Sequence, residues 1–305
     1  MPVFDSSDDE FIFLNCLTVI NEDSEYHYVE EWYKSIDNLS EHQFHNIFRM
    51  SKRCFSSLID LIIEKYSIKN LAKKLRVFIF FISHKTTYRL IQEQFGVSKS
   101  TLFDWITELA VVMSSIAHEK IKFPTKEEYE ELTQGFEEIC GVKNCLLALD
   151  GTEIQISRPN SQPFSYYNRH DIFSVKFLCA IDYKLRFRGV SYGFGASHDS
   201  FVYSASRLRD KIENISDRNV FILADSAFTG FRNIVATVST INFPISEQML
   251  TKYKKMRIKV ENAFGLFKGK FKRFSGRIIF GHSDKSIRLI KASIFIHNFI
   301  IEFNE

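Results

Sequence analysis

The sequence predicts a mixed α/β sheet domain that follows a helical region. Four apolar stretches of strand length lie at residues 145–156, 174–181, 187–194 and 220–224. A helix is expected at residues 199–212, between the third and the fourth of them. Upstream, residues 45–63 and 75–83 carry apolar side chains densely enough for packed helices, with a basic interruption at residues 69–74. Strands and helices in this order favour an α/β or α+β sheet whose strand ends carry the function.

Charge is distributed unevenly along the 305 residues, although the net charge is only +3. Residues 1–40 hold ten acidic side chains and one basic one, Lys34, which leaves the rest of the chain strongly basic. Such an asymmetry suggests an acidic arm on a body that meets polyanions. The alternative is a solvated acidic tail without a partner.

Composition also argues against several classes of protein. The five cysteines form no C-x-x-C pair, which disfavours a disulfide framework or a thiolate zinc site and favours reduced thiols. The longest apolar run, residues 77–82, is too short to span a bilayer, so no membrane segment is expected. The acidic N-terminal residues do not resemble a secretory signal.

Residues 86–106 have the pattern of a helix-turn-helix. Gly96 would make the turn, and Ser98 is a good N-cap for a second helix that buries Leu102 and Trp105. In a helix-turn-helix the second helix offers its first residues to DNA, which here are Lys99, Ser100 and Thr101. The alternative is an ordinary helical hairpin. Downstream, Thr125 and Glu128 fit a capping box that opens a polar helix ending near Gly141.

Two aspartates follow buried apolar runs. Asp150 comes after Cys145–Leu149 and Asp225 after Val220–Ala224. An ionised carboxylate in such a place is costly unless a cation or several donors compensate it. A metal ligand fits this requirement, and the alternative is an aspartate that caps a Gly151-Thr152 turn at a strand end. We expect Asp199 to cap the following helix, although His198 and Asp199 could instead assist a metal or a water. His297 is expected to be a core histidine.

The last helical block begins near Glu247 and contains a basic segment. Between residues 252 and 277 a single acid, Glu261, stands among ten basic residues, which are Lys252, Lys254, Lys255, Arg257, Lys259, Lys268, Lys270, Lys272, Arg273 and Arg277. At helical spacing Glu261 aligns with Arg257 and Lys268. The glutamate could therefore serve a site or simply pair with its basic neighbours.

Taken together, these stretches resemble the PIF/Harbinger transposases and the nucleases derived from them. The blocks that carry the resemblance are Phe48-Arg49-Met50-Ser51 with residues 95–101, Leu149–Ile154, residues 167–174 with Gly195–Ser200, Ala224–Phe228, residues 257–273, and Ala292–Phe299. Six blocks in order are a specific signal. The chain departs from the family at Ala224 and Ala227, where glycine is usual, and residues 1–40 match nothing general in it.

The resemblance implies an RNase H-like core with Asp150, Asp225 and Glu261 as a catalytic triad on two Mg²⁺ ions, with Mn²⁺ as an alternative. Charge and pattern divide off an acidic segment at 1–40 and a helical domain at 41–140, and the resemblance implies a nuclease domain at 141–305. Phosphate contacts are expected from the basic residues near Glu261 and from the second helix. The residues expected to bind DNA are Lys99, Ser100, Thr101, Lys255, Arg257, Lys268, Lys270, Lys272 and Arg273.

The function implied is a metal-dependent DNA endonuclease located in the nucleus, or in the cytoplasm until it is imported with a partner. A Myb/SANT-like companion protein and a homo-oligomer are possible partners. One alternative is a DNA-binding or scaffold protein that does not cut, and another is a nuclease acting on RNA.

Overall fold

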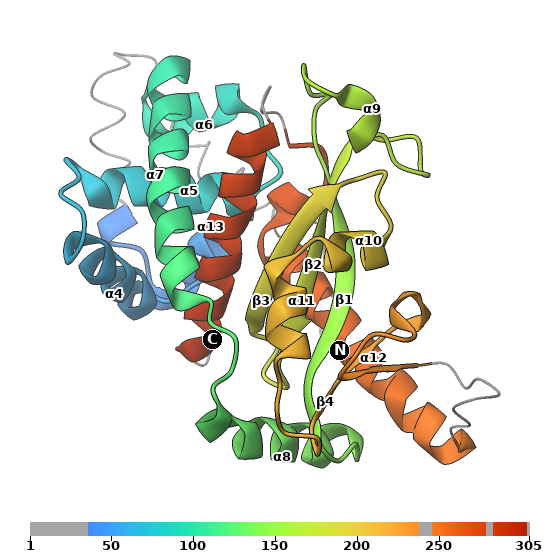
Figure 1. Ribbon diagram of the computed structural model, residues 1–305. Helices are drawn as coiled ribbons and strands as arrows, with labels where there is room; N and C mark the ends of the chain where they lie inside the picture. The colour runs from blue at the N-terminus through green and yellow to red at the C-terminus, as the bar shows by residue number, and fades with distance from the viewer. Residues whose placement is uncertain (1–35, 238–245, 279–282, 304–305) are drawn as a thin grey trace.

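The computed structural model describes residues 36–237, 246–278 and 283–303, with the side chains of residues 259 and 260 left aside (Figure 1). Most of the acidic segment 1–40 therefore lies outside the described residues. The part that the structure describes is a mixed α/β fold, as the sequence predicts. A group of helices from the first half of the chain lies beside a sheet and its covering helices.

Five helices precede the sheet region. They are α3 (Glu41–Phe48), α4 (Lys52–Ile63), α5 (Leu71–Ser83), α6 (Tyr88–Phe95) and α7 (Lys99–Lys120). Helix α5 begins at Leu71, earlier than expected, and takes in the basic residues predicted to interrupt it. The reason is that Leu71 and Leu75 are both buried one turn apart, while Lys74 reaches Glu108 at 2.6 Å.

The expected turn between α6 and α7 is present. Gly96 ends α6 with a left-handed φ of 56°, a conformation that glycine adopts without strain. Ser98 caps α7 by accepting a hydrogen bond from the Thr101 N–H at 3.1 Å. By length and composition α7 is apolar enough to cross a membrane, but core helices pass the same test, and its buried residues pack against α5 and the C-terminal helix.

The described strands form one five-stranded sheet in the order β3-β2-β1-β4-β5. Strands β1 (Cys145–Gln155), β2 (Ser174–Ile181) and β3 (Phe187–Phe194) are antiparallel, while β4 (Phe221–Ala224) and β5 (Ile234–Ala236) run parallel to β1. Strand β5 was not predicted. The helix expected at 199–212 is instead two helices, α10 (Asp199–Ser204) and α11 (Arg207–Glu213). The break occurs because Ser206 is the N-cap of α11 and accepts a hydrogen bond from the Arg209 N–H.

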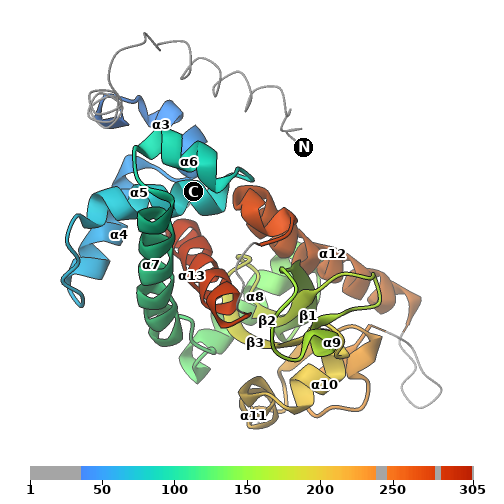
Figure 2. The same ribbon diagram turned by 90° about the horizontal axis from the view of Figure 1, so that it is seen from above.

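Helices cover both faces of the sheet (Figure 2). On one face α10 and α11 approach closely because Gly193 and Gly189 have no side chains, and a Cβ there would lie 2.6 and 2.7 Å from Val202 and Leu208. On the other face lie α12 (Glu247–Lys270) and α13 (Ser283–Glu302), whose side chains surround Phe187. The remaining elements are η1 (Lys126–Glu128), α8 (Tyr129–Cys140), α9 (Pro163–Tyr166), η2 (Ser226–Phe228) and η3 (Lys272–Ser275). The Thr125 N–H donates to Glu128 at 2.9 Å, as the predicted capping box requires.

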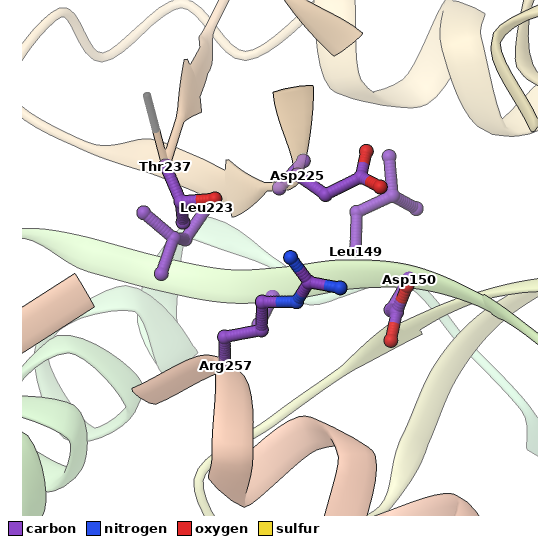
Figure 3. A pocket seen from close by; sticks show the side chains of 8 residues that line it. Leu149, Asp150, Leu223, Asp225, Thr237 and Arg257 are labelled. Carbon is purple, nitrogen blue, oxygen red and sulfur yellow. The ribbon is translucent and has the colours of Figure 1, made fainter. Parts of the chain in front are cut away.

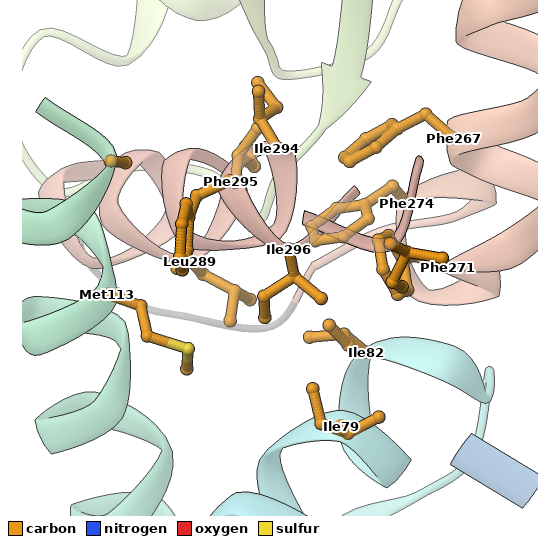
Figure 4. Close-up of a cluster of buried hydrophobic side chains, with 14 of the residues drawn as sticks. Ile79, Ile82, Met113, Phe267, Phe271, Phe274, Leu289, Ile294, Phe295 and Ile296 are labelled. Carbon is orange, nitrogen blue, oxygen red and sulfur yellow. The ribbon is translucent and has the colours of Figure 1, made fainter. Parts of the chain in front are cut away.

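Helix α13 joins the helical region to the sheet. Its apolar residues pack against α7 through Met113, against α5 through Ile82 and against α12 and η3 through phenylalanines (Figure 4). His297 on α13 is fully buried and bonds to the Leu185 carbonyl at 3.1 Å. Burial lowers its pKa to about 4, so it is the neutral core histidine that the sequence predicts.

Candidate active site

Asp150 lies in the middle of β1 and not at its end. The strand continues through Gly151, which pairs with Leu178, as far as Gln155. The expected Gly151-Thr152 turn is therefore absent, and with it the alternative in which Asp150 only caps that turn. Its carboxylate accepts a hydrogen bond from the Gly151 N–H at 2.8 Å within the strand.

Asp225 lies level with Asp150 because their strands run side by side in parallel. Ala148 pairs with Leu223, so the two aspartates follow their strands' apolar residues by the same distance. Together with Arg257 from α12 they line one small pocket (Figure 3). The structure thus brings together two of the three predicted catalytic acids.

The loop at Asp225 accommodates the two alanines that depart from the family pattern. Asp225 caps η2 by accepting from the Ala227 N–H at 3.0 Å, which an alanine supplies as well as a glycine. Ala224 is buried and pairs with Ala236 of β5. Neither alanine displaces the carboxylate from the pocket.

The pocket holds Asp150 in an unfavourable environment for a charge. Its pKa is raised to about 6, mainly by burial and to a smaller extent by the nearby charges of Asp225 and Asp199. The Gly151 N–H and the Arg257 guanidinium act in the opposite direction. In Figure 3 the guanidinium points into the space between the two aspartates, so an internal cation stands where negative charge is concentrated.

Glu261 is joined to this site only through Arg257. It lies one turn further along α12, its side chain is 51% exposed, and it accepts from the Arg257 Nε at 3.0 Å. The glutamate does not line the pocket. Among the described residues no group of three acidic, histidine or cysteine side chains is arranged to hold a metal ion.

Asp199 belongs to the surroundings of the site, where the sequence favoured a helix cap. It is the first residue of α10, and the N-cap position falls on His198, which makes no side-chain cap bond. Its carboxylate lies against Gly151, so close that a Cβ there would be 2.6 Å from Oδ2, and it pairs with Lys176 at 2.8 Å. The predicted cap is therefore wrong. In the sequence, the His198-Asp199-Ser200 motif was the feature that could have indicated a position of Asp199 near Asp150.

The expected DNA-binding residues lie in several different environments. Lys99 and Ser100 are exposed at the start of α7, and Thr101 is half-buried beside them. On α12, Lys255 is exposed, whereas Lys268 donates to the Glu153 carbonyl at 3.1 Å and burial lowers its pKa. Lys270 and Lys272 are half-buried.

Arg273 is a structural cation and not a surface contact. It is buried in η3, where its guanidinium donates to the carbonyls of Phe81 at 3.1 Å and Thr86 at 2.7 Å and lies over the Phe81 ring. The prediction that Arg273 binds DNA is not supported by this position.

Comparisons with known proteins agree with this architecture. Residues 149–298 match the family described as DDE superfamily endonuclease, and residues 24–115 match a domain of unknown function, DUF8040. No solved structure matches the chain significantly.

Three curated relatives show the extent of the similarity. Protein ALP1-like of Arabidopsis thaliana is 24% identical over 69% of this chain and 55% of its own length. HARBI1 of Xenopus laevis, which is named as a nuclease, is 28% identical over 44% of this chain and 39% of its own length. The Arabidopsis protein Antagonist of Like Heterochromatin Protein 1 is 22% identical over 88% of this chain and 75% of its own length. The family match spans both pocket aspartates and Glu261, and residues 149–298 form a DDE superfamily endonuclease domain.

Proposed function

We propose that this chain is a metal-dependent DNA endonuclease of the PIF/Harbinger transposase type, with Asp150, Asp225 and Glu261 as its catalytic acids. The observation that carries the proposal is the shared pocket of Asp150 and Asp225, which lie level with each other on two neighbouring parallel strands. Helix α12, which carries Glu261, lines the same pocket through Arg257. The mixed sheet with helices on both faces supports an RNase H-like core.

The donor set suits divalent metal ions. Carboxylate oxygens are the ligands that Mg²⁺ and Mn²⁺ prefer. A metal ion would also offset the cost of ionising Asp150, whose pKa is raised mainly by burial. Asp150 and Asp225 would hold the ions, and Glu261 would join them on release from Arg257. When bound, two such ions would supply an activated water and stabilise the leaving oxygen of a phosphodiester.

The protein's own residues have separate tasks in this proposal. Asp150 and Asp225 supply the carboxylate oxygens that would hold the metal ions in place relative to the strands. In the metal-free protein Arg257 offsets part of the charge of Asp150 and pairs with Glu261, and in the metal-bound protein it would be free to contact a phosphate of the substrate. Exposed Lys255 and the start of α7, with Lys99, Ser100 and Thr101, would contact the DNA backbone. A Myb/SANT-like companion and a nuclear location remain part of this proposal.

A second candidate function is a DNA-binding or scaffold protein that does not cut. The Arg257–Glu261 ion pair favours it, because a permanent pair would keep the third acid away from the pocket. One of the relatives is named for antagonism of a heterochromatin protein and not as a nuclease. The two candidates differ in whether purified protein cleaves DNA.

Cleavage of a supercoiled plasmid by purified protein tests the proposal. Nicking is expected with Mg²⁺ or Mn²⁺ and not with chelator. Asp150→Asn, Asp225→Asn and Glu261→Gln keep side-chain shape while removing charge, so each should lower cleavage by at least about 100-fold. DNA affinity in chelator should change little, because the phosphate contacts belong to lysines and arginines.

The matched control is Glu247→Gln, which removes an exposed acid at the start of the same helix and should leave cleavage unchanged. Equal cleavage in chelator, or variants that cut like wild type, would contradict the nuclease. Tight binding without cleavage under every metal condition would favour the second candidate.

A further inference from the structure

Helix α13 carries three cations along the side that it leaves open between α7 and β3. Lys285, Arg288 and Lys291 follow one another at intervals of three residues, so they lie on neighbouring turns of the helix. Figures 1 and 2 both show α13 lying alongside α7, with the sheet on its other side. The three residues belong neither to the pocket nor to the basic segment of α12.

Aromatic rings on both neighbouring elements hold the outer two cations. The Lys285 ammonium lies 4.4 Å from the centre of the Phe103 ring on α7. The Lys291 ammonium lies 4.3 Å from the centre of the Tyr192 ring on β3, and Arg288 is exposed between them. A ring face orients an ammonium without neutralising its charge.

Within the part of the chain that the structure describes, none of the three cations forms an ion pair with a carboxylate, and the outer two contact aromatic rings instead. Burial lowers the pKa of Lys291, and the charge of Arg288 lowers it further, which shows that like charges are close together. Like charges gathered on one surface favour a polyanion as the partner.

Two exposed aromatic residues of β3, Tyr192 and Phe194, lie on the side of Lys291. We call them, together with Lys285, Arg288 and Lys291, the strip. Tyr192 is 46% exposed and Phe194 is 38% exposed, although both lie on a sheet strand. The Tyr166 ring of α9 packs edge-on against Phe194 at 5.0 Å and holds it in place. Exposed rings beside a row of cations are the arrangement by which proteins bind single-stranded nucleic acid, because bases stack on rings while the backbone meets the cations.

We propose that Lys285, Arg288 and Lys291 of α13, with Tyr192 and Phe194 of β3, bind an unpaired strand of the DNA substrate. The strip rests on the proposed function, since it assumes a nucleic-acid substrate. The strip would be a DNA-binding surface in addition to the pocket and the start of α7. Unlike those two, it would prefer unpaired DNA. A duplex keeps its bases stacked inside and gains only the phosphate contacts.

Binding by the strip is tested by fluorescence anisotropy with a labelled 20-nucleotide single strand and a matching duplex. The affinities are measured over a range of salt and in chelator, where no cleavage occurs. In the triple variant Lys285→Gln, Arg288→Gln, Lys291→Gln, the logarithmic salt slope for the single strand should fall by about 2, as expected for the loss of three phosphate contacts. Tyr192→Leu and Phe194→Leu should each weaken single-strand binding by roughly fivefold or more and leave duplex binding nearly unchanged.

The control variant is Arg207→Gln with Lys211→Gln. Both residues are exposed on α11, which covers the opposite face of the sheet, so the variant removes surface charge without touching the strip. Circular dichroism and thermal unfolding verify that all variants fold. Polyglutamate of equal charge should displace the single strand poorly, because it has no bases to stack.

The outcomes separate this inference from the proposed function. If wild-type protein binds neither DNA form, the proposed function fails and the strip fails with it. If wild type binds DNA but the triple variant keeps its affinity and slope, the strip is refuted while the nuclease stands. Equal losses for single strand and duplex in the ring variants, or efficient displacement by polyglutamate, would refute the stacking of bases.

Discussion

Asp150 is half-buried beside two other carboxylates, Asp225 and Asp199. The Arg257 guanidinium offsets part of the charge of Asp150, and Lys176 pairs with Asp199. The ionised form of Asp150 therefore costs the metal-free fold free energy. The apolar run before each aspartate predicted that Asp150 and Asp225 directly follow buried stretches of strand, but not that β1 continues past Asp150. The approach of Asp199 to Gly151 could not be predicted, because it depends on how α10 crosses the sheet and not on the residues around either position. In the same way, sequence spacing allowed Glu261 a pairing with Arg257 but could not decide whether it forms.

The pH dependence of stability should reveal the cost of this charge. The folded-state pKa of about 6 lies above the ordinary value of 3.8, so the penalty is present above pH 6 and disappears as the pH falls through 6 toward 4. In chelator, Asp150→Asn should be more stable than wild type by about 2–3 kcal/mol at pH 8 and nearly equal to it at pH 4. Urea unfolding at both pH values measures the difference. Asp104→Asn, at an exposed position on α7, should show no such gain, and a destabilised Asp150→Asn protein at pH 8 would contradict the argument.

At the scale of elements, short-range signals predicted the elements that have their own caps and apolar periodicity. The turn at Gly96, the cap at Ser98 and the capping box at Thr125 were all found as expected. Strand β5 was missed because three residues carry little pattern, and its form comes from pairing with β4. The burial of Arg273 was not predicted for a related reason. A basic residue in a basic segment looks like a surface residue until the tertiary fold buries it.

Arg273 connects η3 to the end of α5, and its removal should loosen that junction. Arg273→Met leaves the carbonyls of Phe81 and Thr86 without their donor, so it should lower the free energy of unfolding by about 1–3 kcal/mol. Nucleic-acid affinity of the folded variant should stay at the wild-type level. Thermal unfolding and anisotropy measure the two effects. The control is Arg277→Gln at an exposed neighbouring position, which should change stability little and weaken nucleic-acid affinity. If Arg273→Met instead weakened affinity and left stability unchanged, Arg273 would have a DNA-binding role.

At the scale of the whole molecule, one apolar core extends from the first helices to the sheet. The residues of α13 that fill it face α5, α7 and α12 at the same time. The sharing of that core between distant segments is a tertiary property, which local sequence patterns do not reveal. The predicted boundaries at residues 40 and 140 follow changes in sequence pattern and say nothing about this sharing.

A fragment of residues 36–143 should therefore fail to fold alone. It should keep helical far-ultraviolet circular dichroism, bind a hydrophobic dye and unfold without cooperativity, because the face of α7 that packs on α13 is exposed. Addition of a peptide of residues 283–302 should restore a cooperative transition. Cooperative unfolding of the fragment without the peptide would show instead that the helical region is an independent domain.

The shared helix has a consequence for synthesis in the cell. Residues 36–120 leave the ribosome well before α13, and at ordinary translation rates the interval is on the order of ten seconds. During that time the first helices have an apolar face with nothing to cover it, and such a surface is a target for chaperones or for aggregation. The chain must also complete its sheet before α13 can close the core. Productive folding of this protein therefore depends on how well the nascent helices are protected until translation of α13 is finished.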